Sequence, residues 1–264
     1  MTDLKNFYEP TCEHDESGYI WEKSGLYQGD IMKYPRDQRN GLTDNAYRWP
    51  NATIPFYIED SHFSPTEITA ILSAIREFES KTCVRFRPYR KSDENWVFIT
   101  GNENGCWSFI GNQQKGGQQL NLQSPGCGRK GTVMHEMLHA CGFLHEQSTY
   151  NRDNYVKILT ENIEDEHLFN FLRYNDSVVT DYNTTYDYDS IMHYSAYAFS
   201  KNGKPTIKAT RENRTTLGQR NGFSQTDLIK LNQMYRKTCN PPAGKRDHNG
   251  MLNTMDWFRQ MFPQ

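Results

Sequence analysis

The sequence predicts an α+β fold from three helical segments, several short strand-like runs and one long irregular stretch. Residues 64–83 repeat apolar side chains at the spacing of an amphipathic helix. Two more helices are expected over about 132–140 and 224–239. Between 176 and 222 the chain is rich in Tyr, Asn, Thr and Gly, which indicates mostly irregular structure.

The first helix has the clearest signals at its start. Ser64 can cap it, Pro65 suits its first turn, and Glu67 completes a capping box with Ser64. The apolar stripe that should face the core consists of Ile68, Ile71, Leu72, Ile75 and Phe78. Short strands are expected at 84–86, 96–99 and 120–122.

Length and charge limit the classes of function. The chain has 264 residues, which fits one large domain with an attachment, or two small domains. Thirty Lys and Arg against 32 Asp and Glu give a formal charge of −2, so there is no basic footprint for nucleic acid or an anionic membrane. A mean hydropathy of −0.87 and the lack of a long apolar run exclude a membrane-spanning helix.

Cysteines and glycosylation motifs favour an extracellular protein. None of the six cysteines stands in a CxxC pair, which argues against a four-thiolate zinc site. Four N-glycosylation sequons begin at Asn51, Asn175, Asn183 and Asn213. The first residues lack the apolar region of a secretory signal, so we expect that signal to have been removed or to lie outside this sequence. The alternative is a cytosolic protein with buried thiols.

Three histidines lie close together in the string HEMLHACGFLH at 135–145. His135 and His139 are one helical turn apart, so both imidazoles can reach one ion. Gly142 can adopt the left-handed conformation that ends a helix and returns His145 to that ion. Three neutral imidazoles suit Zn²⁺ and leave a position for water, which Glu136 can deprotonate. The competing interpretation, an amphipathic helix with surface histidines, does not explain the complete pattern.

This string is the signature of metzincin peptidases. Together with SIMHY at 190–194, GCWSFIG at 105–111, NRDNYV at 151–156 and LGQR at 217–220, it resembles the astacin family of zinc endopeptidases, from about residue 27 to residue 239. The resemblance implies a twisted mixed sheet with two long helices, a largely irregular C-terminal subdomain and an active-site cleft between them. It also implies one zinc ion and the hydrolysis of peptide bonds in proteins.

The resemblance assigns roles to several further residues. Met192 should lie beneath the zinc as a packing floor, and Tyr194 should ligate the zinc at rest and later bond the oxyanion. Trp107, Ser108 and Phe109 match the cleft-edge strand that pairs with an extended substrate, although they also fit a plain aromatic strand. Arg220 suggests a preference for acidic residues after the scissile bond, and a solvated arginine is the alternative.

The same resemblance implies two disulfides, Cys83–Cys239 and Cys106–Cys127. Cys12 and Cys141 have no counterparts in the family pattern. We expect Cys141 to point into the core as a small hydrophobe. For Cys12 a partner outside this chain and pairing with Cys141 both stay open.

Residues 27–30 (Tyr-Gln-Gly-Asp) resemble the inhibitory motif of astacin propeptides, whose aspartate binds the zinc and displaces water. Asp30 is therefore expected to be an inhibitory ligand. Alignment of Tyr47, Arg48 and Trp49 with the start of the family's mature enzymes places the new N-terminus at Asn40. A trypsin-like protease would then cut after Arg39. The released ammonium of Asn40 is expected to be buried against Glu146, for which a surface carboxylate is the alternative.

The sequence as a whole predicts the proenzyme of a secreted, monomeric zinc endopeptidase that acts on proteins or peptides. Residues 1–39 form the pro-segment, 40–239 the catalytic domain and 240–264 a short tail. Two other functions are weighed: a secreted binding module with an inactive peptidase fold, and a zinc-loaded ligand whose pro-segment stays attached. The intact Glu136 and Tyr194 argue against the first of these.

Overall fold

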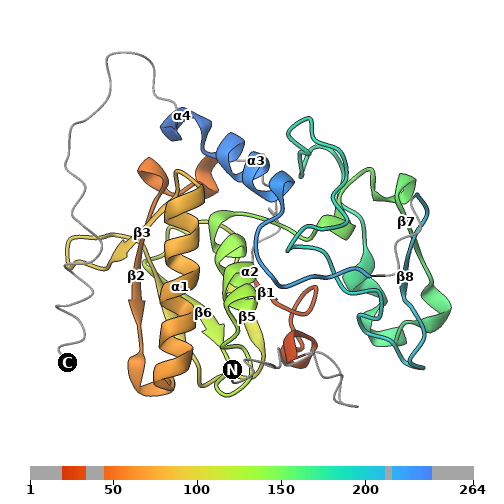
Figure 1. Ribbon diagram of the computed structural model, residues 1–264, viewed down its shortest axis with the longest axis horizontal. Helices are drawn as coiled ribbons and strands as arrows, with labels where there is room; N and C mark the ends of the chain where they lie inside the picture. The colour runs from red at the N-terminus through yellow and green to blue at the C-terminus, as the bar shows by residue number, and fades with distance from the viewer. Residues whose placement is uncertain (1–19, 34–44, 212–215, 240–264) are drawn as a thin grey trace, which may run out of the picture.

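The computed structural model describes residues 20–33, 45–211 and 216–239 (Figure 1). A mixed six-stranded sheet forms the N-terminal half, with strand order β1-β5-β6-β4-β2-β3. All neighbouring strands are parallel except β5 and β6. The strands are β1 (Ile31–Met32), β2 (Thr53–Ile58), β3 (Arg85–Pro88), β4 (Trp96–Thr100), β5 (Cys106–Phe109) and β6 (Gly117–Leu122).

Two long helices, α1 (Pro65–Lys81) and α2 (Lys130–Cys141), lie side by side on one face of this sheet (Figure 1). The expected capping box is present, since the Glu67 amide donates to Ser64 Oγ and the Ser64 amide donates to Glu67 Oε2. The apolar stripe of α1 faces the core as predicted, and Ile68 is its only member that is not fully buried. The α+β prediction is confirmed.

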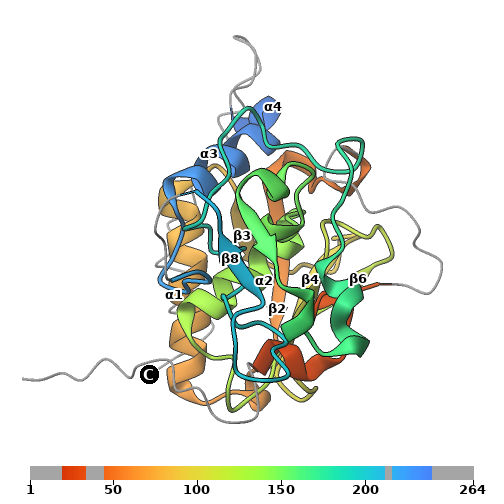
Figure 2. The same ribbon diagram turned by 90° about the vertical axis from the view of Figure 1, so that its right-hand side faces the viewer.

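The C-terminal half lies beside the sheet and consists mostly of loops (Figures 1 and 2). Its regular elements are the antiparallel pair β7 (Val156–Ile158) and β8 (Ile207–Ala209), and the helices α3 (Gln225–Met234) and α4 (Arg236–Cys239). Short 3₁₀ helices occur at Ile20–Ser24, Asn45–Tyr47, Pro50–Ala52, Asp60–His62, Glu146–Ser148, Arg152–Asn154, Thr160–Asn162 and Asp165–Phe171. The irregular structure expected for 176–222 is therefore confirmed, apart from β8.

Several elements differ from the sequence prediction. Strands β1, β2 and β7 were not among the strands expected. Strand β2 contains Pro55, which cannot donate to a sheet ladder. The single helix expected over 224–239 is interrupted at Tyr235, whose φ and ψ are −104° and 19°. The Tyr235 hydroxyl donates to the carbonyl of Cys141 at 2.9 Å, so this residue ties the interruption to the end of α2.

Both implied disulfides are formed, with Cα–Cα distances of 5.4 Å for Cys83–Cys239 and 5.8 Å for Cys106–Cys127. Cys141 is a fully buried free thiol, as expected, and burial raises its pKa. Cys12 lies outside the described residues.

Three of the four sequon asparagines, Asn51, Asn175 and Asn183, are exposed, and Asn213 lies outside the described residues. Within the described ranges, no helix combines the length and the apolar character needed to cross a membrane.

Helix α3 holds two segments of the C-terminal half in place. The Asp227 carboxylate accepts hydrogen bonds from Ser190 Oγ at 2.7 Å and from the Ile191 amide at 3.0 Å. One turn further along, Lys230 Nζ lies 2.6 Å from Glu146 Oε2, and both side chains are only 7% exposed. Burial alone would lower the pKa of Lys230, but the Glu146 carboxylate raises it above its ordinary value.

We expect Lys230→Met to lower the free energy of unfolding by about 3–5 kcal/mol, because it leaves the Glu146 carboxylate buried without a counter-charge. Urea denaturation at pH 7 measures this loss. The double variant Glu146→Gln/Lys230→Met removes both charges and should regain most of the stability. If Lys230→Met lowers the free energy of unfolding no more than the double variant does, the buried ion pair between Lys230 and Glu146 is contradicted.

Burial raises the pKa of Asp227 from an ordinary 3.8 to about 6, so the folded protein holds this proton more tightly than the unfolded chain does. The contribution to stability is complete below about pH 4 and is lost as the pH rises through 6. The advantage of wild type over the non-titrating Asp227→Asn variant should shrink by about 3 kcal/mol between pH 4 and 6. Urea denaturation of both proteins across this pH range tests the prediction. A difference in the free energy of unfolding that stays constant with pH would refute it.

Candidate metal centre

Helix α2 presents His135, Glu136 and His139, all of them buried. The helix ends at Gly142, whose φ of 115° and ψ of 13° are left-handed, as the sequence predicted. The Gly142 amide donates to the carbonyls of Leu138 and His139. This turn returns the chain so that the side chain of His145 faces the other two imidazoles.

Asp30 completes a cluster with these three histidines. Its Oδ2 lies 3.0 Å from His135 Nε2 and 3.1 Å from His145 Nε2, and its Oδ1 lies 3.4 Å from His139 Nε2. His135 Nε2 and His145 Nε2 are 3.3 Å apart. Ligands at about 2.0–2.1 Å from one tetrahedral ion are themselves separated by roughly 3.3–3.4 Å, so the spacing fits a single zinc ion.

The shifts in pKa within the cluster also favour the protonation states that bind a cation. Burial would raise the pKa of Asp30, but the neighbouring imidazoles of His145, His139 and His135 hold it well below its ordinary value. Burial lowers the pKa of His135 and of His145, which favours neutral rings. A carboxylate beside neutral imidazoles is a donor set of the kind that zinc prefers.

Glu136 is buried next to the cluster. Neither of its carboxylate oxygens has a hydrogen-bond partner among the described residues, and the side chain is 1% exposed. Burial raises the pKa of Glu136 well above its ordinary value, the charge of Asp30 raises it further, and Arg220 opposes the rise. A carboxylate of raised pKa can take and return a proton near neutral pH.

Tyr194 and Met192 are both buried, and Tyr194 contacts one of the three histidines. The fully buried Tyr194 ring is 4.7 Å from the ring of His145, and its hydroxyl donates to the Gln28 carbonyl at 2.6 Å. In this structure, then, its hydroxyl is held by the N-terminal segment, and the cluster's oxygen ligand comes from Asp30. Met192 is 1% exposed and belongs to the main hydrophobic core.

The N-terminal segment covers the edge of the sheet at this site. Strand β1 pairs with β5 in parallel, and the Ser108 amide donates to the Asp30 carbonyl at 2.9 Å. Trp107, Ser108 and Phe109 are buried in this arrangement. Arg220 is half-buried, and its Nη1 donates to the His193 carbonyl at 3.1 Å. Arg39 and Asn40 lie outside the described residues.

The structure adds residues that the sequence did not single out. Gln28 contacts His145, and Lys230 contacts Glu146, whose other oxygen, Oε1, accepts from the Asp187 amide at 3.0 Å. Gln28 stood inside the YQGD string, but no local pattern indicates that its side chain reaches a residue 117 positions away.

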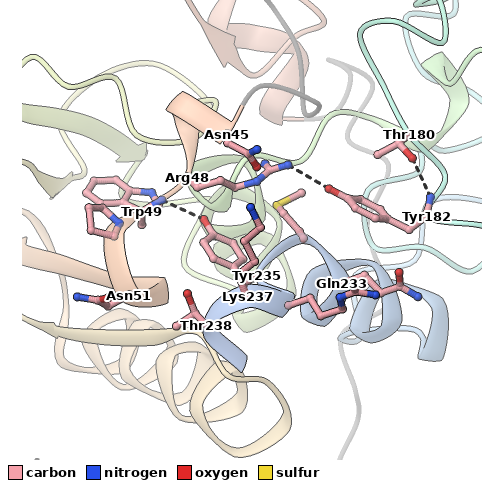
Figure 3. Close-up of a pocket in the computed structure, with 13 residues that line it drawn as sticks. Asn45, Arg48, Trp49, Asn51, Thr180, Tyr182, Gln233, Tyr235, Lys237 and Thr238 are labelled. Carbon is pink, nitrogen blue, oxygen red and sulfur yellow. Dashed lines mark hydrogen bonds between the residues drawn. The ribbon is translucent and has the colours of Figure 1, made fainter. Parts of the chain in front are cut away.

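A separate hollow of about 670 Å³ lies between residues 45–51 and the end of α3 (Figure 3). Within it, Arg48 Nη2 donates to the Tyr182 hydroxyl at 3.1 Å, and the Trp49 amide donates to the Tyr235 hydroxyl at 3.4 Å (Figure 3). None of the four cluster residues lines it, so this hollow is distinct from the metal centre.

Comparison with known proteins agrees with this site. The model of the Astacin peptidase family matches residues 41–236. Seminal metalloprotease 1 of Drosophila melanogaster is 40% identical over 219 residues, which cover 81% of this chain and 87% of that protein. Human meprin A subunit beta is 41% identical over 215 residues, which cover 80% of this chain but only 29% of that subunit.

A solved structure is similar in fold as well as in sequence. The high choriolytic enzyme 1 (HCE-1), a hatching enzyme zinc-protease from Oryzias latipes (Medaka fish), superposes with a TM-score of 0.65 at 34% identity. The match covers 78% of this chain and 98% of that chain. With the family model, the relatives and the histidine cluster in agreement, the chain belongs to the astacin family of zinc endopeptidases.

Proposed function

We propose that this chain is the proenzyme of a secreted zinc endopeptidase and that cleavage after Arg39 activates it. The observation that carries the proposal is the position of Asp30, whose two oxygens lie 3.0–3.4 Å from three imidazole nitrogens. A carboxylate there takes the place that a reacting water needs. Residues 1–39 thus act as an inhibitory segment, ahead of a catalytic domain at 40–239 and a tail at 240–264.

In the activated enzyme, each step of peptide hydrolysis has a residue to perform it. Zinc, when bound by the three histidines, supplies a Lewis acid that polarises the scissile carbonyl and lowers the pKa of water. Glu136 accepts the proton of the attacking water and then delivers it to the leaving amine. Tyr194, once released from the Gln28 carbonyl, donates a hydrogen bond from its hydroxyl to the oxyanion of the tetrahedral intermediate.

Substrate would bind where β1 now lies. Removal of the N-terminal segment uncovers the edge of β5, and an extended peptide can pair with Trp107, Ser108 and Phe109 there. Arg220 lies close enough to influence the pKa of Glu136, which supports a preference for acidic residues just after the scissile bond. The new ammonium of Asn40 would approach Glu146.

Two further features support secretion and processing outside the cell. Two disulfides are typical of oxidising compartments, and the three described sequons are exposed for glycosylation. A trypsin-like protease matches the basic residue at position 39. We infer that the enzyme acts as a monomer on protein or peptide substrates.

Treatment with trypsin tests the proposal. Zinc-loaded chain should not cleave a quenched peptide until trypsin has produced a new N-terminus at Asn40, because Asp30 stays in the cluster until then. A metal chelator added after trypsin has been inhibited should abolish the activity. Full activity before trypsin, or activity that survives the chelator, would contradict the proposal.

Glu136→Gln should lower the kcat/KM of the trypsin-treated enzyme by at least about 100-fold, because the amide cannot accept the proton of water. Zinc content should stay at one ion per chain, since the three imidazoles are untouched. Glu161→Gln, which changes an exposed carboxylate, is the matched control and should leave the activity unchanged. More than about 1% residual activity in Glu136→Gln would overturn the role assigned to Glu136.

A further inference from the structure

The three histidines of the cluster differ in what supports them from behind. Two of them donate from Nδ1 to backbone carbonyls of the catalytic domain: His135 to Ile191 at 2.8 Å and His139 to Phe143 at 2.8 Å. A hydrogen bond of this kind fixes the proton on Nδ1, so that Nε2 presents its lone pair to the ion. Both acceptors belong to the chain after residue 40 and remain when the N-terminal segment leaves.

His145 is supported differently. Its Nδ1 lies 3.0 Å from Oε1 of Gln28, a side chain of the N-terminal segment. When the Nε2 lone pair of His145 binds a zinc ion in the cluster, the proton of the neutral ring lies on Nδ1 and needs an acceptor. The carboxamide of Gln28 supplies that acceptor.

Gln28 is held firmly in the orientation that this contact needs. Its side chain is fully buried, and its Nε2 lies 3.1 Å from Ser148 Oγ, which turns Oε1 toward His145. Its amide donates to Asn170 Oδ1 at 2.7 Å, and its carbonyl accepts from the Tyr194 hydroxyl at 2.6 Å. Every polar group of Gln28 is therefore engaged with the catalytic domain.

We propose that Gln28 is a positioning residue of the metal centre, so that the N-terminal segment raises the affinity of this centre for zinc through His145 as well as through Asp30. Outer-shell acceptors fix the tautomer of a ligating histidine and increase its basicity, and their loss costs roughly 10–100-fold in metal affinity. The uncleaved chain is then the form best suited to acquire zinc. The statement that activation weakens zinc retention rests on the proposed removal of residues 1–39.

The affinity of the intact chain tests the role of Gln28 without any cleavage. Competition with a chromophoric zinc chelator should show that Gln28→Leu binds zinc about 10–100-fold more weakly than wild type. Gln28→Glu keeps an acceptor oxygen, to which Ser148 can donate, and should restore the affinity. Gln119→Leu is the matched control, because this partly buried glutamine contacts Thr100 in the sheet and should leave zinc binding unchanged.

A spectroscopic readout separates positioning from a loss of folding. In the zinc-loaded wild type and in Gln28→Glu, the Nδ1 proton of His145 should be protected from exchange and visible by NMR, and in Gln28→Leu it should exchange with solvent. If Gln28→Leu fails to fold, Gln28→Asn replaces it in these measurements. Its side chain is too short to reach His145, so it should also bind zinc more weakly and lose the protection of the Nδ1 proton. Unchanged zinc affinity, with the proton still protected in the folded variant, would overturn the proposal.

The consequence of activation is tested separately. Intact Asp30→Ala keeps Gln28, whereas wild type cleaved by trypsin and freed of its N-terminal segment by gel filtration has lost both residues. We expect the cleaved enzyme to bind zinc about 10–100-fold more weakly than intact Asp30→Ala, and equal affinities would refute this. If Gln28→Leu weakens zinc binding but trypsin releases no peptidase activity, the proposed function fails and the role of Gln28 stands.

Discussion

A buried carboxylate enclosed by three imidazoles is the interaction on which the rest of this structure depends. Asp30 has no exposed surface, and its oxygens lie within 3.4 Å of His135, His139 and His145. Burying an ionised carboxylate costs several kcal/mol unless a cation compensates it. A zinc ion in the cluster would supply that charge, and in the proenzyme that we propose the same carboxylate would deny the ion to water and substrate. Under this proposal, inhibition and metal binding depend on the same carboxylate.

Hydrogen bonds to backbone groups connect the helices of the fold to the histidine cluster. The capping box at the start of α3 fixes Asp227, which accepts from the Ile191 amide, and the Ile191 carbonyl accepts from His135. The Cys83–Cys239 disulfide joins the end of α4 to the residues that follow α1. The first helix, the last helix and the histidine helix are therefore mechanically coupled, although only α2 supplies ligands.

Features set by local spacing were predictable from the sequence, and features set by distant contacts were not. The histidine pair, the left-handed Gly142 and the capping box of α1 follow from residues a few positions apart. Strand β2 was not predicted. Its Pro55 is unusual inside a strand, and the place of this segment in the sheet is decided by pairing with its distant neighbours β3 and β4. Lys230 looks like a polar position on a helix, and its role appears only once Glu146, 84 residues earlier, is beside it.

Zinc K-edge X-ray absorption on the intact, zinc-loaded chain tests the central claim most directly, because it reports the atoms bound to the ion. Three imidazole nitrogens and a carboxylate oxygen should appear at about 2.0–2.2 Å, with no sulfur. The amplitude or the distance of the oxygen contribution to the spectrum should change when Asp30 is replaced by alanine. A sulfur ligand at about 2.3 Å, fewer than three imidazoles, or a spectrum that is indifferent to Asp30 would contradict the account.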